Sequence, residues 1–258
     1  MVGAAALFAL ANVALYDGLT VRNYKISTPL VSAKHRFVLI TDLHSTFYGK
    51  KQEKLLSAIE KYSPEAVLFA GDIAHDKRDF AGTEVLLTAL VKKYPCYYVT
   101  GNHEKLVDFT PDIKGLISEC GVEVVSDKSI DIGDNIVIHG VDDPLFYSDK
   151  FESVLAQRET SDEKYDILLS HRPEYAEQYS KMGFDLALCG HAHGGQVRVP
   201  LLLNGLYAPH QGLFPKYAGG QYAFDNGNQV IVSRGLMIND LPRVFNPPEL
   251  VVIDIEAK

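Results

Sequence analysis

Five short apolar runs along the chain each end abruptly in polar residues. The runs are nearly continuous rather than alternating, which is typical of strands whose two faces are both buried. Stretches with helical periodicity separate several of them; in residues 53–62, for example, Leu55, Leu56 and Ile59 form one apolar face. Strands that alternate with helices predict an α/β fold. The five runs end at residues 42, 72, 102, 171 and 191.

A second set of strand-like runs occurs in the sequence without helices between them. Residues 129–133 and 135–140 are expected to form a hairpin, and 122–125, 229–233 and 250–255 are expected to be further strands. We therefore predict two packed mixed β-sheets flanked by helices, in four α/β/β/α layers. Residues 194–227 are rich in Gly, Pro and Tyr and are expected to form one ordered long loop. Further helices are expected at 83–94, 109–120 and 173–182.

The polar residues that end the five runs point to a single site. In open α/β sheets, ligands bind at the carboxyl ends of strands. Here those ends carry D-x-H, G-D, G-N-H-E, S-H and G-H-x-H, in that order. Each motif alone is common by chance, but a soluble domain has no general reason to end five strands in Asp, Asn or His. The residues are Asp42, His44, Asp72, Asn102, His103, Glu104, His171, His191 and His193.

The side chains in these motifs are those of a mixed oxygen and nitrogen site. Imidazole, carboxylate and amide groups suit first-row transition metals, and no thiolate takes part. Residues two apart on an extended segment point the same way, so both members of the D-x-H and H-x-H pairs can face one metal cluster. Gly101 and Gly190 precede two of the motifs and are expected to let the backbone turn sharply out of the sheet.

Composition and charge narrow the classes of function. The chain has 258 residues, 47% of them hydrophobic, which is enough to bury a core. Its formal net charge of −8 argues against the broad basic face that nucleic-acid binding needs. The same charge repels a phosphorylated substrate, so phosphate affinity must come from a local positive centre, which bound metal ions would supply. The three cysteines, Cys96, Cys120 and Cys189, form no C-x-x-C pair and are expected to be buried free thiols.

The order of motifs from Asp42 to His193 resembles the calcineurin-like metallophosphoesterase superfamily. Downstream, the stretches H-G-G-Q-V-R-V-P from His193, S-R-G from Ser233 and P-P-E from Pro247 are similar to a bacterial, membrane-linked branch of it. That branch includes enzymes similar to UDP-2,3-diacylglucosamine pyrophosphatase. The resemblance implies a metallophosphoesterase sandwich fold and a small-molecule or lipid-linked phosphoester substrate.

The resemblance also implies a role for each matched residue. Two divalent transition metal ions, Mn, Fe or Zn, would be bridged by the carboxylate of Asp72. A hydroxide bridging the metals would attack the phosphorus of a phosphomonoester, a phosphodiester or a pyrophosphate. His103 would assist the leaving group, and Glu104 would orient a neighbouring group. The first metal would be held by Asp42, His44 and His193, and the second by Asn102, His171 and His191.

One position departs from the family pattern. The family usually has an Asp three residues after the bridging Asp, whereas this chain has His75 there, followed by Asp76. The usual Asp is a supporting residue, so its replacement leaves the set of metal ligands complete. The change puts the support around His103 in question.

The first 24 residues are expected to be separate from a phosphoesterase domain at 25–258. Residues 2–16 are apolar apart from Asn12. This run is shorter than the roughly 20 residues of a spanning helix and lacks the cationic leader of a signal peptide. Three interpretations remain: part of a membrane anchor, an interfacial helix, or a helix packed on the domain. Membrane association through residues 1–16 is favoured over a cytoplasmic location, and the sequence indicates neither the side of the membrane nor the oligomeric state.

Two other functions compete with phosphoester hydrolysis. A catalytically inactive metal-binding scaffold on the same fold is expected to have lost Asp72, Asn102 or His103, and all three are present. A metal-dependent peptidase is disfavoured because the chain has no H-E-x-x-H motif.

Several residues outside the motifs receive structural interpretations. His139 is expected to be a core histidine, and Asp142-Asp143 a turn. Arg198 and Arg234 suit either a substrate phosphate or a structural ion pair. The remaining residues are His35 and His210, expected to face solvent or lie in loops, and Tyr207, Phe214, Tyr217 and Tyr222, expected to form an apolar wall or a small loop core.

Overall fold

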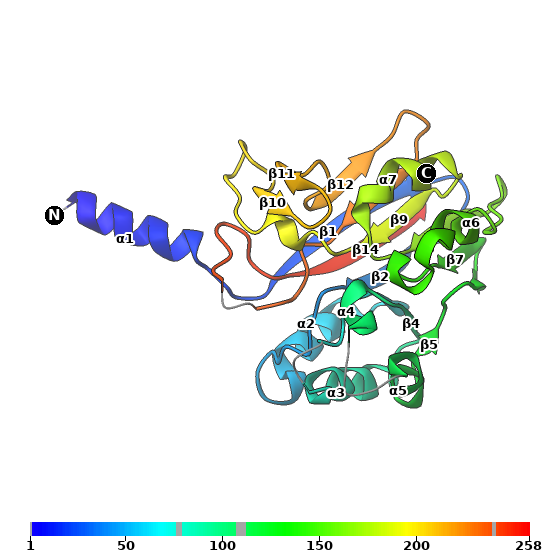
Figure 1. The fold of residues 1–258 in the computed structure, drawn as a ribbon, viewed down its shortest axis with the longest axis horizontal. Helices are drawn as coiled ribbons and strands as arrows, with labels where there is room; N and C mark the ends of the chain where they lie inside the picture. The colour runs from blue at the N-terminus through cyan, green and yellow to red at the C-terminus, as the bar shows by residue number, and fades with distance from the viewer. Residues whose placement is uncertain (1, 76–78, 107–111, 239–240) are drawn as a thin grey trace.

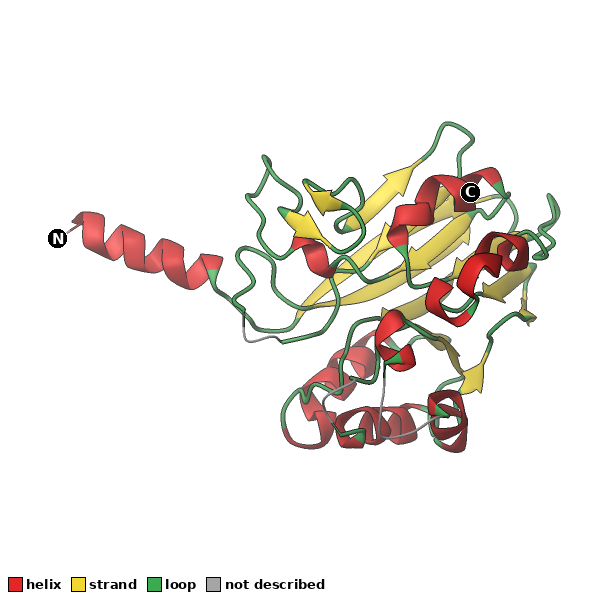
Figure 2. Cartoon of the chain, viewed as in Figure 1, coloured by secondary structure: helices red, strands yellow, loops and turns green. Residues whose placement is uncertain are grey.

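Two six-stranded β-sheets pack face to face and are covered by helices on their outer sides (Figure 1, Figure 2). This computed structural model describes residues 2–75, 79–106, 112–238 and 241–258. The arrangement confirms the predicted α/β class with two packed mixed sheets. The first sheet has the order β1 (Thr20–Thr28), β14 (Glu249–Ala257), β2 (His35–Ile40), β3 (Ala66–Ala70), β4 (Cys96–Val99), β5 (Glu123–Val124). The second has the order β12 (Gly220–Ala223), β13 (Gln229–Val232), β9 (Leu186–Cys189), β8 (Tyr165–Leu169), β7 (Ile136–Gly140), β6 (Ser129–Gly133).

The central strands of both sheets are parallel. β2, β3, β4 and β5 run in one direction in the first sheet, as do β7, β8, β9 and β13 in the second. β14 is antiparallel to β2 and parallel to β1, while β6 and β12 form antiparallel edges of the second sheet. In each sheet the carboxyl ends of the parallel strands therefore lie at the same end of the sheet. The loops that follow these strands carry the predicted motifs.

The continuous apolar runs are explained by burial on both faces of each sheet. Along β2, Phe37 and Leu39 face the core between the sheets, whereas Val38 and Ile40 face the core under the outer helices. Burying each such side chain completely contributes roughly 1.5–3 kcal/mol, so neither face tolerates a polar position. The predicted runs lack alternation for this reason.

The outer helices cover the two sheets from opposite sides. α2 packs Leu55 and Ile59 against the first sheet, as its apolar face predicts. Phe151 and Leu155 of α6 pack in the corresponding core of the second sheet. The helices on the first sheet are α2 (Glu53–Tyr62), α3 (Ala81–Leu90) and α5 (Ile113–Glu119), and those on the second are α6 (Phe151–Leu155) and α7 (Ala176–Lys181). The shorter elements are α4 (Asn102–Lys105) and the 3-10 turns η1 (Lys50–Gln52), η2 (Pro144–Phe146), η3 (Ser148–Lys150), η4 (Pro173–Tyr175) and η5 (His193–Gly195).

Several element boundaries differ from the prediction. The hairpin of β6 and β7 and the helix at 53–62 are confirmed. The expectation that 194–227 is one loop is wrong, because β12 joins the second sheet there, with β10 (Tyr207–Ala208) and β11 (Gly212–Leu213) ahead of it. β1 was not predicted either. Both β1 and β12 are edge strands held largely by backbone pairing, so their sequences lack an apolar run. The expected start of the helix at 109–120 lies outside the described residues.

The N-terminal helix α1 (Val2–Ala14) projects away from the body of the protein (Figure 1). Its last turn is linked to the C-terminal part of the chain by a 2.6 Å hydrogen bond from the Phe245 N–H to the Ala14 carbonyl. Among the residues that the structure describes, no helix has the length and apolar character needed to cross a bilayer. β1 starts at Thr20, ahead of the expected boundary after residue 24, and the division into two parts stays a prediction.

The three cysteines are free thiols, as predicted. Cys96 and Cys189 are buried, whereas Cys120 is only half-buried.

Candidate metal centre

The loops that follow five strands meet at one end of the two sheets. In the first sheet, the backbone N–H groups of Asp42 and His44 donate to the carbonyls of Gly71 and Asp72, at 3.0 Å each. The loops after β2 and β3 are therefore joined by backbone hydrogen bonds beyond the ends of their strands. The same type of contact joins the loops of the second sheet, where the Gly190 N–H donates to the His171 carbonyl at 3.1 Å.

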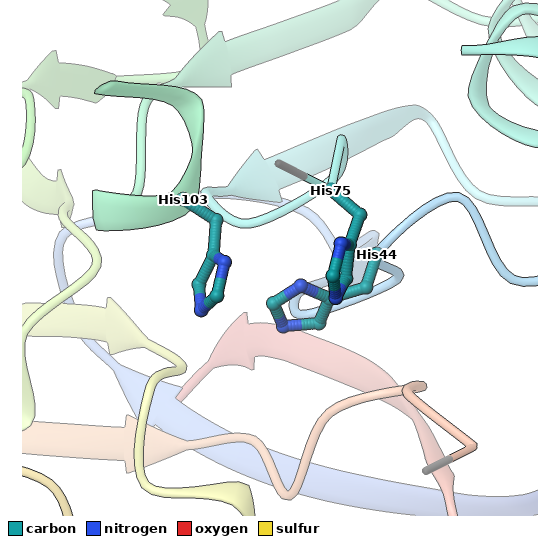
Figure 3. A group of neighbouring side chains, drawn as sticks. All are labelled: His44, His75 and His103. Atoms are coloured by element: carbon teal, nitrogen blue, oxygen red, sulfur yellow. The ribbon is translucent and has the colours of Figure 1, made fainter. Parts of the chain in front are cut away.

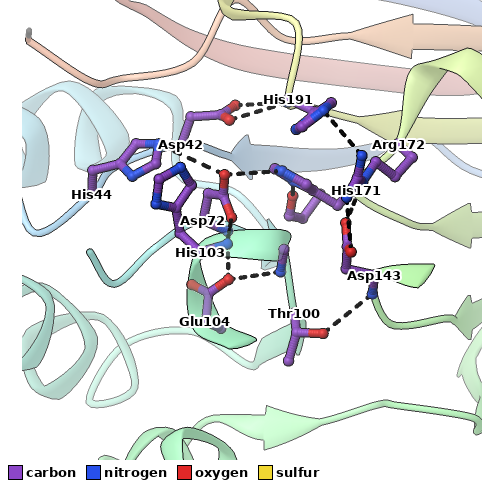
Figure 4. Close-up of polar contacts among 12 residues, drawn as sticks. Asp42, His44, Asp72, Thr100, His103, Glu104, Asp143, His171, Arg172 and His191 are labelled. Carbon is purple, nitrogen blue, oxygen red and sulfur yellow. Dashed lines mark hydrogen bonds and ion pairs between the residues drawn. The ribbon is translucent and has the colours of Figure 1, made fainter. Parts of the chain in front are cut away.

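Two further hydrogen bonds connect the loops of one sheet to the other. The His191 N–H lies 3.1 and 3.2 Å from the two carboxylate oxygens of Asp42 (Figure 4). The Nδ1 atom of His171 lies 2.7 Å from the Ala70 carbonyl. A carbonyl only accepts, so His171 Nδ1 carries a hydrogen and its Nε2 atom is left to face the centre. The predicted site residues thus hold the two sheets in register at this end.

Asp72 occupies the middle of the site. Its Oδ2 atom lies 3.1 Å from His171 Nε2 and 3.8 Å from His44 Nε2. Its Oδ1 atom accepts a 2.8 Å hydrogen bond from the His103 N–H (Figure 4). One carboxylate oxygen therefore lies near imidazoles contributed by both sheets.

The structure brings six of the seven predicted ligands, all except Asn102, into two groups. Within each group, the potential ligand atoms lie within 4.8 Å of one another. Several buried polar atoms make no hydrogen bond to any described residue, and Asn102 Oδ1, His191 Nδ1 and His193 Nδ1 are among them. Buried polar atoms normally have partners, so these lone pairs fit metal coordination. The two groups are Asp42, His44 and His193, and Asp72, His171 and His191.

The backbone at these residues is strained. Asp42, His44, Asp72, His191 and His193 have φ values of 50°, 49°, 53°, 66° and 47°. This left-handed region is uncommon for residues other than glycine, and each such residue costs on the order of 1–3 kcal/mol when it is strained. Residues that are not predicted ligands, such as Ser45, Gln52 and Phe245, share this conformation, so it is not confined to the centre.

Gly101 is required for space, and the expectation that it provides a sharp turn is wrong. Its φ of −104° and ψ of −172° are extended values that any residue adopts. A Cβ atom at Gly101 would lie 2.2 Å from Asp72 Oδ1, and one at Gly71 would lie 2.5 Å from the Gly101 N atom. Gly190 likewise has no positive φ, and its Cβ would lie 2.5 Å from Asp42 Oδ2. Glycines here let the loops approach each other closely.

Electrostatics favour a bound cation. Burial lowers the pKa of His44, His191 and His193, which keeps these imidazoles neutral and able to coordinate. Burial also opposes a charge on His171, but the Asp72 carboxylate outweighs it and raises the pKa of His171 to about 10. The same pairing holds the pKa of Asp72 well below its usual range, although burial acts in the opposite direction. A proton on His171 therefore occupies the place where a metal would neutralise Asp72.

Glu104 clamps the loops after β3 and β4. Its Oε2 atom accepts hydrogen bonds from the N–H groups of Asp72 and Gly101, at 2.8 and 2.7 Å. Its Oε1 atom accepts from Ile73 and Ala74, at 2.6 and 3.0 Å. Burial and the neighbouring Asp72 charge raise the pKa of Glu104 to about 7. Glu104 thus positions the backbone of Asp72 and of the residues around it.

His103 and His75 lie side by side with His44 (Figure 3). The ring centroid of His103 lies 4.6 Å from that of His44 and 5.4 Å from that of His75. His75 therefore occupies the surroundings of His103, where the family pattern has Asp. Asp76 lies outside the described residues.

The sequence interpretation missed the part played by Arg172. Its guanidinium is buried and holds Asp143 through two contacts, one of them 3.0 Å from Nη2 to Oδ1. Asp143 is in turn anchored by its N–H to Thr100 Oγ1 at 3.2 Å, and Asp142 Oδ1 accepts from the Thr100 N–H at 3.0 Å. The Asp142-Asp143 turn therefore ties the loop after β8 to that after β4. The signal in the sequence was an Arg directly after the strand-end His171.

Most of the other residues outside the motifs make contacts that stabilise the fold. His139 is a core histidine, 2.8 Å from Ser129 Oγ and 2.7 Å from Asp166 Oδ1, as predicted. Arg234 binds Glu249 and the Gly219 carbonyl, which favours the structural ion pair.

The expectation that His35 faces solvent or a loop is corrected, since its two ring nitrogens lie 2.8 Å from Glu65 and 2.7 Å from Asp134. Of the four aromatic residues, Tyr217 and Tyr222 form an edge-on pair, whereas Tyr207 and Phe214 are exposed. Arg198 reaches the Phe245 carbonyl at 3.4 Å.

Comparisons with known proteins agree with this geometry. Residues 35–195 match the calcineurin-like phosphoesterase family. An uncharacterized metallophosphoesterase of Campylobacter jejuni is 26% identical over 92% of this chain and 63% of its own length. The metallophosphoesterase YkuE of Bacillus subtilis is 26% identical over 86% of this chain and 79% of its own length. The UDP-2,3-diacylglucosamine pyrophosphatase LpxG of Chlamydia muridarum is 25% identical over 65% of this chain and 53% of its own length. The chain therefore spans less than two thirds of the Campylobacter and Chlamydia relatives.

The Glu104 clamp leads to a first prediction. In Glu104→Gln, one carboxylate oxygen becomes an amide group that cannot accept, so two buried N–H groups lose their acceptor. We expect a loss of about 1–3 kcal/mol in the free energy of unfolding and weaker metal binding, measured by thermal unfolding and metal analysis. Glu84→Gln, on the exposed side of α3, serves as the control. A Glu104→Gln protein with unchanged stability and metal content would contradict the clamp.

The raised pKa of His171 leads to a second prediction. Below pH 10 the metal-free protein holds a proton on His171 Nε2, and a metal must displace that proton to bind the same lone pair. Metal affinity is therefore expected to rise by up to about tenfold per pH unit toward pH 10 and to level off above it. Calorimetry at pH 8, in buffers of different ionisation enthalpy, should detect the proton released on loading. Metal binding without proton release would show that His171 is already neutral.

Proposed function

The chain belongs to the calcineurin-like phosphoesterase family, and we propose that it hydrolyses phosphoric esters at a dinuclear metal centre between the two sheets. The position of Asp72 is the observation that carries this proposal. One of its oxygens lies 3.1 Å from an imidazole of the second ligand group and 3.8 Å from one of the first. Two ions sharing that carboxylate use both imidazoles, whereas a single ion would leave one of the two groups incomplete.

The donor atoms suit Mn, Fe or Zn. When bound, two such ions clamp phosphoryl oxygens, lower the pKa of a water molecule and stabilise the entering and leaving oxygens. In this proposal Asp42, His44 and His193 hold one ion. Asn102, His171 and His191 hold the other, and Asp72 belongs to both.

His103 is the residue proposed to act on the leaving group. It is half-buried at the centre, with its ring against His44. Its own N–H is fixed on Asp72 Oδ1 at 2.8 Å, so the start of α4 is held close to the bridging carboxylate. From that position His103 donates a proton to the leaving oxygen, a role worth typically about 10²–10⁴-fold in rate. His75 supports it with an imidazole in place of a carboxylate.

A lipid-linked phosphoester or pyrophosphate is the proposed substrate class. The Chlamydia relative is named as a pyrophosphatase of a diacylated nucleotide sugar. The segment that begins directly after His193 exposes Leu201, Leu202, Leu213 and Phe214, at 106%, 86%, 67% and 68% of their reference surfaces. Large apolar side chains gathered on one segment mark a contact surface more often than a plain loop. These side chains would meet the apolar part of such a substrate.

Membrane association through α1 is part of the same proposal. Phe8, Leu10 and Val13 are exposed along the helix, which projects from the body (Figure 1). Val13 and Tyr16 also line a surface hollow of about 480 Å³ together with Pro200, beside the apolar segment described above. An interfacial helix next to that segment would keep the enzyme close to a lipid-linked substrate.

A hydrolysis screen tests the proposed function. Protein freed of metal is reloaded with Mn²⁺, Fe²⁺ or Zn²⁺ and assayed with phosphomonoesters, phosphodiesters, nucleotide-sugar pyrophosphates and lipid phosphates. Metal-dependent turnover of one class, with two ions per chain, is expected. Two bound ions without hydrolysis of any class would favour an inactive metal-binding scaffold, and at most one bound ion would refute the dinuclear centre.

His103 leads to a third prediction. His103→Ala is expected to keep its metal content but to lose about 10²-fold or more in rate on an alkyl phosphoester. The loss should shrink for a nitrophenyl ester, because a good leaving group needs little protonation. The two substrates are compared at matched metal occupancy, with His35→Ala, outside the centre, as the control. An identical loss on both substrates would leave His103 as a binding residue only.

The role of α1 leads to a fourth prediction. Deleting residues 1–16 is expected to leave the unfolding temperature and the turnover of a soluble ester unchanged, since α1 lies outside the cores of the sheets. The deletion should abolish co-sedimentation with phospholipid vesicles. Phe8→Glu combined with Val13→Glu should have the same effect without shortening the chain. A deletion that unfolds the protein would place α1 within the folded domain.

A further inference from the structure

His210 contacts a predicted metal ligand from its outer side. It lies in the segment after the last motif, and its side chain is 55% exposed. Its Nδ1 atom lies 2.9 Å from Nε2 of the buried His191. The opposite nitrogen of His191, Nδ1, is one of the buried atoms that make no hydrogen bond to a described residue. The imidazole of His191 therefore has one nitrogen toward the centre and the other on His210.

Arg172 determines which atom carries the hydrogen in this contact. Its Nη1 atom lies 2.6 Å from His210 Nδ1 and 3.3 Å from both Glu174 Oε1 and His191 Nε2. Nη1 carries two hydrogens, and the nearest acceptor, His210 Nδ1, and the Glu174 carboxylate take both, so His191 Nε2 receives none. A guanidinium only donates, so His210 Nδ1 must be an acceptor. An acceptor at that position requires the hydrogen of the 2.9 Å contact to sit on His191 Nε2. His191 Nδ1 then keeps its lone pair, which is the form that can bind a metal.

Arg172 is itself held rigidly. Its guanidinium bonds to both oxygens of Asp143, and its Nη1 atom lies 3.3 Å from Glu174 Oε1. Glu174, His191 and His210 also lie close enough together to hold a cation of their own. The positive charge of Arg172 among them opposes that alternative, since two like charges at hydrogen-bond distance repel strongly when buried.

We propose that His210 is a positioning residue for the metal centre. By accepting the Nε2 hydrogen of His191, it selects the tautomer whose Nδ1 lone pair faces the ion of the second group. The inference rests on the proposed dinuclear centre and adds to it a residue that lies 17 positions beyond the last motif residue, His193. Partners on the outer nitrogen of a ligating histidine typically change metal affinity by about 10–100-fold.

Three variants test the proposal. His210→Leu removes the acceptor, whereas His210→Asn keeps an oxygen near the position of Nδ1. Asp225→Ala changes an exposed residue of the segment 194–227 that has no part in the proposed site and serves as the control. Zn²⁺ affinity of each metal-free protein is measured by competition with a chromophoric chelator, and nitrogen NMR of the Zn²⁺-loaded protein reports the tautomer of His191. Thermal unfolding confirms that each variant is folded.

His210→Leu is expected to weaken one of the two Zn²⁺ sites by about 10–100-fold and to leave the other unchanged. His210→Asn should restore the affinity to within a few-fold of the wild type, and Asp225→Ala should match the wild type. Unchanged affinity in His210→Leu, equal weakening of both sites, or no rescue by His210→Asn would overturn the proposal. A wild-type protein that binds two ions but hydrolyses no ester refutes the proposed function alone, whereas one that binds no ion refutes both.

Discussion

The buried carboxylate of Asp72 is the constraint on which the rest of the structure depends. Its side chain is 1% exposed and lies between imidazoles from both sheets. A carboxylate in such a place is unstable unless positive charge and hydrogen-bond donors surround it. The His103 N–H donates one hydrogen bond to the Asp72 carboxylate. The negative charge of this carboxylate must also be balanced by a nearby cation. The glycines, the clamp of Glu104 and the strained ligand backbone all serve to hold the groups around this one charge.

The site is assembled from both sheets, so its geometry depends on the core between them. Asp42, His44, Asp72 and Asn102 follow strands of the first sheet, whereas His171, His191 and His193 follow strands of the second. The side chains of Phe37 and Leu39 from one sheet, and of Ile167 and Leu188 from the other, fill the space between. Protein interiors are packed too tightly to deform without loss of stability. The distance between the ligands from the first sheet and those from the second is therefore set by the apolar packing between the sheets.

The sequence predicted those features that leave a periodic or local signal. The strands β2, β3, β4, β8 and β9 were predictable because burial on both faces gives continuous apolar runs, and their polar ends located the site. The edge strands β1 and β12 were not, because backbone pairing on an edge needs no apolar run. Arg172 and His210 were missed because their roles arise from contacts between loops, to Asp143 and His191, that sequence spacing does not encode. Gly101 was assigned a turn because only the folded structure reveals how closely Asp72 approaches it.

The clamp formed by Glu104 has a consequence for how the protein acquires its metals. The four N–H groups it binds fix the loops through contacts within the protein itself. These contacts would hold the backbone around Asp72 in place independently of a bound ion. Divalent ions bind such nitrogen and oxygen donors in an order set by their own chemistry, so a preformed cage discriminates among them only weakly. On the proposed function, the supply of ions around the newly folded chain, as much as the ligand set, would then decide which ions the site holds.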